Sequence, residues 1–312
     1  TVLSATAVLH GSITLGVMLS IQYIIGQMQG PVTQFVSFMQ DTQDAQLSLE
    51  RLGEIHGKPD EETEGMDQET EISGKDPIRL NNVIFTYGSE KSKRIIKGLS
   101  LDIPAGKTTA IVGLSGSGKT TLIKLMLGFY PPTEGTVTIG RQSLQKISFK
   151  EWRKHCGVVM QEGFIFGDTI ANNIVPDGNM IDKKRLLYAV EMANIRDFVE
   201  SLPLKYNTKI GNTGQGLSQG QKQRILIARA IYRNPDYLFF DDNEKVIQGN
   251  LEKFFKDKTV VIVAHRLSTV KNADQIVVLK EGEITEKGTH DELITRQGDY
   301  YRLVKNQLEL SA

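Results

Sequence analysis

The sequence predicts an α/β fold with a parallel core sheet, an antiparallel β edge and a helical subdomain, preceded by a transmembrane α-helical segment. Four short apolar runs rich in β-branched residues are typical of strands buried in a parallel sheet: 108–112, 237–241, 259–264 and 275–279. Two other runs, 78–87 and 94–103, alternate apolar and polar side chains, as antiparallel strands with one exposed face do. Residues 1–40 contain no Asp, Glu, Lys or Arg, although 24% of the whole chain is charged.

The uncharged N-terminal stretch predicts a helix in a membrane. Residues 13–39 are long enough to cross a bilayer, and 41–55 continue the helical spacing with charges, as a helix entering water would. Pro31 is expected to kink this helix, and Arg51 indicates the cytoplasmic side. Five polar residues interrupt the apolar run and are expected to face other helices: Gln22, Gln27, Gln29, Thr33 and Gln34. A buried helix of a soluble domain is the alternative.

Composition narrows the possible classes of partner. The 37 basic and 37 acidic residues balance, so no global positive field points to nucleic acid. The single cysteine, Cys156, excludes an internal disulfide and is expected to be a small buried hydrophobe rather than a nucleophile. The acidic stretch 57–76 indicates a solvated linker rather than a metal site. Because the chain begins at Thr1 without methionine, we expect a fragment or a processed product.

A glycine-rich stretch, Gly113-Leu-Ser-Gly-Ser-Gly-Lys-Thr120, fits the phosphate-binding pattern G-x-x-x-x-G-K-[ST]. Its glycines let backbone N–H groups converge on an anion. Lys119 is expected to reach the terminal phosphates and Thr120 to ligate Mg²⁺. The stretch lies between a predicted strand and a helix at 121–127, so the helix N-terminus faces the phosphates. The predicted binding residues here are Gly113, Ser115, Gly116, Ser117, Gly118, Lys119, Thr120 and Thr121.

Other motifs surround this loop. Asp241 ends an apolar strand, where a carboxylate can hold the Mg²⁺ shell. Ser218 is a good N-cap for a helix at 218–232, with Gln221 at the capping-box position and the small Gly220 leaving room for a second anion. Gln161 ends a predicted strand at 157–161. His265 follows the strand at 259–264, at the sheet edge where ligands bind.

Together these motifs resemble those of ATP-binding cassette (ABC) exporters, and the resemblance covers nearly all of 78–308. Taken as a whole, the amino-acid sequence looks most similar to those of bacterial peptidase-containing peptide or bacteriocin exporters. The resemblance implies a P-loop NTPase core in which Tyr87 stacks on adenine and Gln161 senses the metal. It also implies that Ser218 and Gly220 contact the γ-phosphate bound to the opposite subunit, and that His265 holds the γ-phosphate of its own. Taken alone, Tyr87 and His265 would be an edge-strand aromatic and a strand-end histidine.

The same resemblance implies an ATPase that couples hydrolysis to export of a substrate such as a peptide, with ATP and Mg²⁺ as cofactors. Its partners would be a second cassette, as a homodimer, together with a transmembrane domain and membrane lipid. The expected location is the cytoplasmic (inner) membrane, with the nucleotide-binding domain on the cytoplasmic side. We expect 1–56 to end the transmembrane domain, 57–76 to link, and 77–312 to form the nucleotide-binding domain, with a helical subdomain at about 162–235.

The sequence departs from this family directly after Asp241. The family continues with a catalytic glutamate and a loop, whereas this chain reads Asp241-Asp-Asn-Glu-Lys245 and lacks several residues. Asp242 is the candidate replacement for the glutamate that polarises the attacking water. A natural degenerate site, an engineered deletion and residues left out of the numbering all remain open. The alternatives for function are an ATP-binding regulatory cassette that no longer hydrolyses and a soluble cassette ATPase without a transport role.

Overall fold

The computed structural model describes residues 2–57, 61, 72–88, 92–161, 163–175, 180–211, 214, 216–241, 250–264 and 270–309. The chain divides into two compact units, Thr1–Glu61 and Glu62–Ala312.

The first unit is a helical pair, α1 (Val2–Leu9) and α2 (Leu15–His56). Helix α2 is continuous for 42 residues and passes through Pro31, which confirms the predicted helix across 13–55. Four hydroxyl groups along α2 donate to the carbonyl four residues earlier, so these polar side chains are satisfied within the helix: Ser20, Thr33, Thr42 and Ser48.

The helix predicted at 13–39 is present as part of α2. Among the residues that the structure describes, no helix combines the length and the hydropathy required for a membrane crossing. The glutamines at 22, 27, 29 and 34 lower the hydropathy of this run.

The second unit is built on a six-stranded sheet with the order β10-β9-β3-β8-β7-β6. Strands β6 (Cys156–Val159), β7 (Tyr237–Asp241), β8 (Thr259–Val263), β3 (Thr108–Val112) and β9 (Gln275–Lys280) are parallel, which confirms the predicted core. Strand β10 (Glu283–Gly288) pairs antiparallel with β9 and was not predicted. Its residues are exposed or half-buried and strongly charged, as suits an edge strand, so it lacks the apolar run that reveals the others.

A four-stranded antiparallel sheet, β2-β1-β4-β5, forms the predicted β edge. Its strands are β1 (Ile78–Thr86), β2 (Arg94–Ile103), β4 (Glu134–Ile139) and the two-residue β5 (Gln142–Ser143). Apolar partners such as Ile78 and Ile103 face each other across β1 and β2. They share a core with helix α3 (Lys119–Met126) and with one face of the parallel sheet, which contributes Phe239 and Val261.

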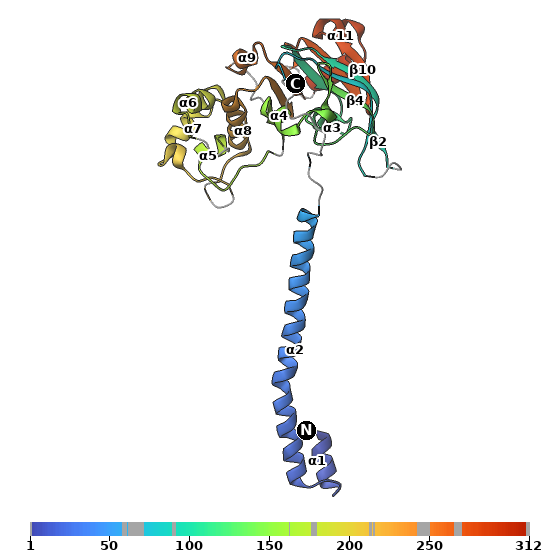
Figure 1. Ribbon diagram of the computed structural model, residues 1–312, viewed down its shortest axis with the longest axis vertical. Coiled ribbons are helices and arrows are strands. Elements are labelled where there is room, and N and C mark those ends of the chain that lie inside the picture. Colours follow the sequence, from blue (N-terminus) through green and yellow to red (C-terminus); the bar gives the residue numbers. More distant parts are fainter. Residues whose placement is uncertain are drawn as a thin grey trace. The chain divides into compact units, whose positions relative to one another are not determined.

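The opposite face of the parallel sheet packs against helices. Alternate strand residues such as Phe240 and Ile262 join a core with α5 (Ile170–Ile174), α6 (Lys183–Met192), α7 (Arg196–Ser201) and α8 (Gln219–Arg233). These four helices gather away from the antiparallel strands (Figure 1). Helices α6 and α7 are separated at Asn194, which adopts φ 52°.

Asn173 of α5 fixes the start of this helical subdomain through hydrogen bonds to the backbone. Its side chain is fully buried, and its amide donates to the carbonyls of Phe166, Asp168 and Thr169. Arg229 of α8 donates to the Asn173 carbonyl at 2.7 Å. Short helices also complete the unit: α4 (Phe149–Lys154), α9 (Asn250–Phe255), α11 (His290–Arg296) and α12 (Asp299–Glu309).

Candidate nucleotide-binding site

The glycine loop between β3 and α3 lies against its neighbours at two positions that only glycine can occupy. Gly113 has φ 155°, and a Cβ there would lie 2.1 Å from the carbonyl oxygen of Leu279 on β9. Gly118 has φ 104°, and a Cβ there would lie 2.9 Å from Ile96 on β2. At Gly113 the obstacle is the backbone of β9, whereas at Gly118 it is the tip of the Ile96 side chain, and there the left-handed φ is what favours glycine. The loop therefore passes close to both sheets.

Lys119 opens α3 and folds back over this loop. Its side chain is buried, and its ammonium donates to the carbonyls of Gly113 and Leu114, both at 2.9 Å. An ammonium group carries three N–H donors, and the described residues accept from it through these two carbonyls. Burial lowers the pKa of Lys119, and the nearby Asp241 carboxylate opposes that shift. The loop therefore contains a positioned, partly desolvated cation.

Asp241 reaches the same place from the carboxyl end of β7. It is 6% exposed, and among the described residues no hydrogen bond to its carboxylate is present. A buried carboxylate normally requires a cation, and Lys119 is close enough to interact with it. Within the described part of the chain, no three His, Cys, Asp or Glu side chains come together. A single buried carboxylate at a phosphate-binding loop fits Mg²⁺, which takes one or two carboxylates plus phosphate oxygens, and the exposed Thr120 follows Lys119 on the same loop.

Gln161 lies at this edge of the sheet, but not where the sequence predicted. Strand β6 ends at Val159, so Gln161 belongs to the following turn rather than to the strand. Val159 pairs with Phe240, which puts Gln161 one residue beyond the level of Asp241 on the adjacent strand. A cavity of about 270 Å³ separates this turn from the first turns of α8 and is lined by Met160, Gln161, Gly163, Gln219, Lys222, Gln223 and Leu226.

Tyr87 follows β1 and lies beside α3. Its hydroxyl shares a 3.2 Å hydrogen bond with Thr121, and 39% of the residue is exposed. Phe85 and Tyr130 both meet the Tyr87 ring edge to face, with centroid distances of 4.9 and 5.3 Å. The ring is therefore fixed in orientation while part of it stays free for a ligand. Thr121 is buried and its hydroxyl contacts Tyr87, so its role at the phosphates stays a prediction.

Ser218 and Gln221 form the predicted capping box at the start of α8. The Ser218 hydroxyl accepts from the Gln221 N–H at 3.2 Å, and the Gln221 side chain accepts from the Ser218 N–H at 2.9 Å. The Ser218 hydroxyl proton remains free to donate to an anion. Gly220 is half-buried on the first turn, where free N–H groups point out of the helix.

Two predicted catalytic residues, Asp242 and His265, lie outside the described residues, and their roles stay predictions.

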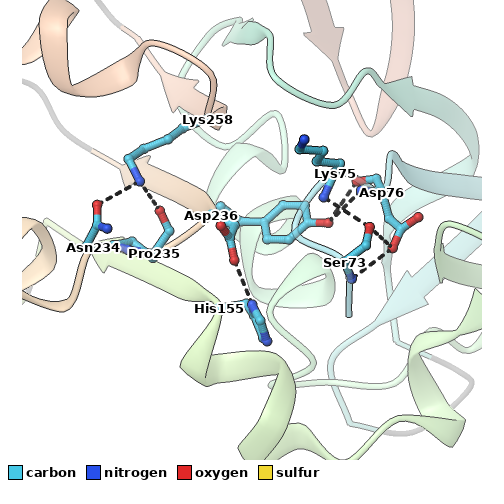
Figure 2. A network of polar contacts seen from close by, with 9 residues as sticks. Ser73, Lys75, Asp76, His155, Asn234, Pro235, Asp236 and Lys258 are labelled. Atoms are coloured by element: carbon cyan, nitrogen blue, oxygen red, sulfur yellow. Dashed lines mark hydrogen bonds and ion pairs between the residues drawn. The ribbon is translucent and has the colours of Figure 1, made fainter. Parts of the chain in front are cut away.

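The sequence also left some residues unassigned that the structure brings into contact. Tyr130 fixes Tyr87, and only its position in an aromatic pair before two prolines offered a signal. Figure 2 shows a polar network at the other end of the parallel sheet, which joins Ser73 and Asp76, both within the predicted linker 57–76, to a His155–Asp236 pair. Their separation in the chain hides this network from any local pattern.

Comparison with known proteins agrees with this geometry. The sequence model of a family described as "ABC transporter" matches residues 96–244, which run from β2 through the glycine loop to the end of β7. This part of the chain is an ABC transporter ATP-binding domain. The prediction of a P-loop cassette fold is confirmed.

Several curated relatives of this chain share one name. The leukotoxin translocation ATP-binding protein LktB of Mannheimia glucosida is 37% identical over 317 residues, covering 99% of this chain and 44% of the relative. The LktB proteins of Mannheimia haemolytica and Bibersteinia trehalosi match with the same identity and coverage. The chain thus spans about half the length of the curated relatives it matches.

A solved structure resembles the ABC domain and the helices before it. The structure of a bacterial Atm1-family ABC exporter with ATP bound has a TM-score of 0.74 and 29% identity, covering 94% of this chain and 52% of that one.

The length of the LktB match shows that this chain lacks some positions of its relative. It extends over 317 residues, whereas this chain has 312, so at least five aligned positions have no counterpart here.

Proposed function

We propose that this chain is the ATP-binding and ATP-hydrolysing part of an ABC exporter and moves a peptide or protein substrate out of the cell. The observation that carries the proposal is the pair of buried, oppositely charged side chains, Lys119 and Asp241, at the glycine loop. A buried cation, and a buried carboxylate that accepts no hydrogen bond from the described residues, are the two charges that an Mg–nucleotide complex requires. LktB is named for leukotoxin translocation, which supports a proteinaceous substrate.

Each residue has a definite task in this proposal. The free Lys119 donor and the loop N–H groups bind phosphate oxygens, and Tyr87 presents its fixed ring to the adenine. Asp241 and the Thr120 hydroxyl hold Mg²⁺, and Gln161 lies beside them to sense it. Bound Mg²⁺ supplies positive charge that offsets the charge developing on the transferred phosphoryl group.

A second copy of the chain completes the site. In our proposal Ser218, Gly220 and Gln221 contact the γ-phosphate held by the Lys119 loop of the opposite subunit. The free hydroxyl proton of Ser218 and the exposed first turn of α8 support this role. Each subunit would serve the cytoplasmic face of the inner membrane beside a transmembrane domain and lipid, as in the membrane-associated exporters that it resembles.

The hydrolytic step is the weak point of this site. Directly after Asp241 the chain has Asp242 where the resemblance implies a glutamate, and the LktB match contains at least five positions, at places that the match does not assign, without a counterpart in this chain. Asp242 is one methylene shorter than a glutamate, and His265 would hold the γ-phosphate. This interruption favours a second candidate, an ATP-binding regulatory cassette whose hydrolysis is slow.

One experiment tests the proposal and separates the two candidates. Equilibrium titration with ATP and Mg²⁺ measures binding, and release of inorganic phosphate measures turnover. Saturable binding with phosphate release supports the ATPase, while binding without release supports the regulatory cassette. Absence of saturable ATP binding would refute both.

A further inference from the structure

The starts of two neighbouring strands are joined at the edge of the sheet that lies opposite the nucleotide site. The backbone N–H groups of Asp236 and Tyr237 donate to the carbonyl of His155 at 3.1 and 3.0 Å. The His155 ring and the Asp236 carboxylate share a hydrogen bond of 2.7 Å (Figure 2). His155 directly precedes β6, and Asp236 directly precedes β7, so this pair fixes the two strands at their beginnings.

The other ends of these strands carry two residues of the proposed Mg²⁺ site. Strand β7 ends at Asp241, and β6 leads within two residues to Gln161. The strands pair in parallel from Cys156–Tyr237 to Val159–Phe240, and every residue of β7 is buried. At about 3.3 Å per residue, β7 spans about 13 Å from Tyr237 to Asp241. Because buried strands resist bending, a displacement at their beginnings is carried to their ends.

A short segment before β1 is attached to these strand beginnings. The Tyr237 hydroxyl donates to the Asp76 carbonyl at 2.9 Å and accepts from the Asp76 N–H at 3.2 Å. Ser73 closes the segment on itself by donating to the Asp76 carboxylate at 2.9 Å. Gly74 has φ 69°, and a Cβ there would lie 2.5–2.8 Å from the carboxylate atoms of Asp236. Ile72 is buried in the core at the start of the segment.

Further interactions stabilise the contact between Tyr237 and Asp76. Tyr237 is fully buried, and burial raises the pKa of its hydroxyl, which keeps the proton that the bond to Asp76 requires. Its ring also packs against Trp152, with centroids 4.8 Å apart. Lys258 donates to Asn234 and Pro235, which directly precede Asp236 (Figure 2). The segment therefore meets the strands at a braced point rather than at a loose surface.

We propose that residues 72–76, Tyr237 and the His155–Asp236 pair act as a positioning relay, through which tension on the chain entering the nucleotide-binding domain changes the placement of Asp241 and Gln161. The inference rests on the proposed function, because it assigns these residues an effect on the Mg²⁺ site. Tyr237 is a positioning residue in this relay, since it acts on the metal site through β7 and does not touch the nucleotide.

The test compares Tyr237→Phe with a matched control in the full chain. Tyr237→Phe removes the hydroxyl and keeps the ring on Trp152. Tyr300→Phe is the control, because Tyr300 is equally buried and its hydroxyl bonds to His290 on the C-terminal helices instead. The measurement is the ratio of ATP affinities with and without Mg²⁺, alongside the melting temperature. Groups that orient metal ligands typically change metal affinity about 10-fold when removed, so we expect Tyr237→Phe to reduce this ratio by about that factor.

A second pair of variants approaches the relay from the segment. Gly74→Ala places a methyl group against Asp236, whereas Gly106→Ala introduces the same strain at φ 66° with nothing within 4 Å. We expect Gly74→Ala to reduce the Mg²⁺-dependent ratio and Gly106→Ala to leave it unchanged. ATP affinity without Mg²⁺ should stay constant in all four variants.

The outcomes separate the relay from the proposed function. Equal ratios in Tyr237→Phe and Tyr300→Phe overturn the relay, as does an equal loss of affinity with and without Mg²⁺, while ATP binding by the unmodified chain leaves the function intact. Failure of the unmodified chain to bind ATP overturns both.

Discussion

Replacement of Lys119 by alanine examines the proposed site most directly. The ammonium donates to two loop carbonyls, and in our proposal its third donor binds a phosphate oxygen. A hydrogen bond to a charged group contributes about 1.5–3 kcal/mol. Loss of that single bond should therefore weaken ATP binding by about 10- to 150-fold, at 1.4 kcal/mol for each factor of ten.

The effect of this substitution on folding should be small by comparison. The Gly113 and Leu114 carbonyls that lose their donor are half-buried and exposed, so water can replace the ammonium. Asp241 loses a neighbouring positive charge, but the cost of burying the Lys119 ammonium is removed at the same time. A large drop in ATP affinity with a nearly unchanged melting temperature is the expected pattern.

The assay is a titration with a fluorescent ATP analogue, with and without Mg²⁺. Lys124→Ala is the matched control, because Lys124 lies on the same helix near its end and is half-buried. The control should bind ATP as the unmodified chain does. If Lys119→Ala binds within a factor of about two of Lys124→Ala, a difference below 0.5 kcal/mol, the phosphate-binding assignment of the glycine loop is wrong.

Three further predictions concern the adenine, pH and hydrolysis. Tyr87→Ala should weaken ATP by about 1–2 kcal/mol while Tyr87→Trp binds normally, and equal binding of the two variants in a titration would remove the stacking role. Burial lowers the pKa of Lys119, so above that lowered pKa the unfolded chain binds more protons than the folded chain does. The free energy of unfolding, compared with that of Lys119→Met, should therefore rise as the pH approaches 10.5. If urea titrations give the same difference between the two proteins at every pH, this prediction is wrong. The chain should release phosphate about 100-fold more slowly than an intact homologue. Insertion of a glutamate-containing loop after Asp241 should restore the rate, and adding His265→Ala to that variant should abolish it again. Phosphate release at the homologue's rate without the insertion would refute the prediction of slow hydrolysis.

The sequence by itself determined the parallel core and the phosphate-binding loop. Both follow from neighbouring residues: β-branched apolar runs favour buried strands, and Gly113 and Gly118 allow backbone angles that other residues resist. Capping at Ser218 was predictable for the same reason, since its partner Gln221 is three residues away. In each case the information lies within one turn or one strand.

Elements with weak local patterns were not predicted from the sequence. Strand β10 is exposed and charged, β5 has two residues, and helices α4 and α5 have six and five, too few for a helical period to emerge. The strand at 157–161 was predicted too long because Met160 is apolar, whereas pairing with β7 stops at Val159. The long helix predicted from the uncharged stretch is present as α2.

Only the tertiary structure decided which distant residues meet. Strand order brings Asp241 to Lys119 across more than a hundred residues, and folding of β1 against α3 brings Tyr87 to Thr121. Tyr237 holds Asp76 across 161 positions, a contact that no composition or spacing encodes. Local sequence patterns indicate the backbone conformation of a segment and which of its side chains are buried. The contacts between distant residues depend instead on the order in which the buried strands pair, and packing of the whole domain decides that order.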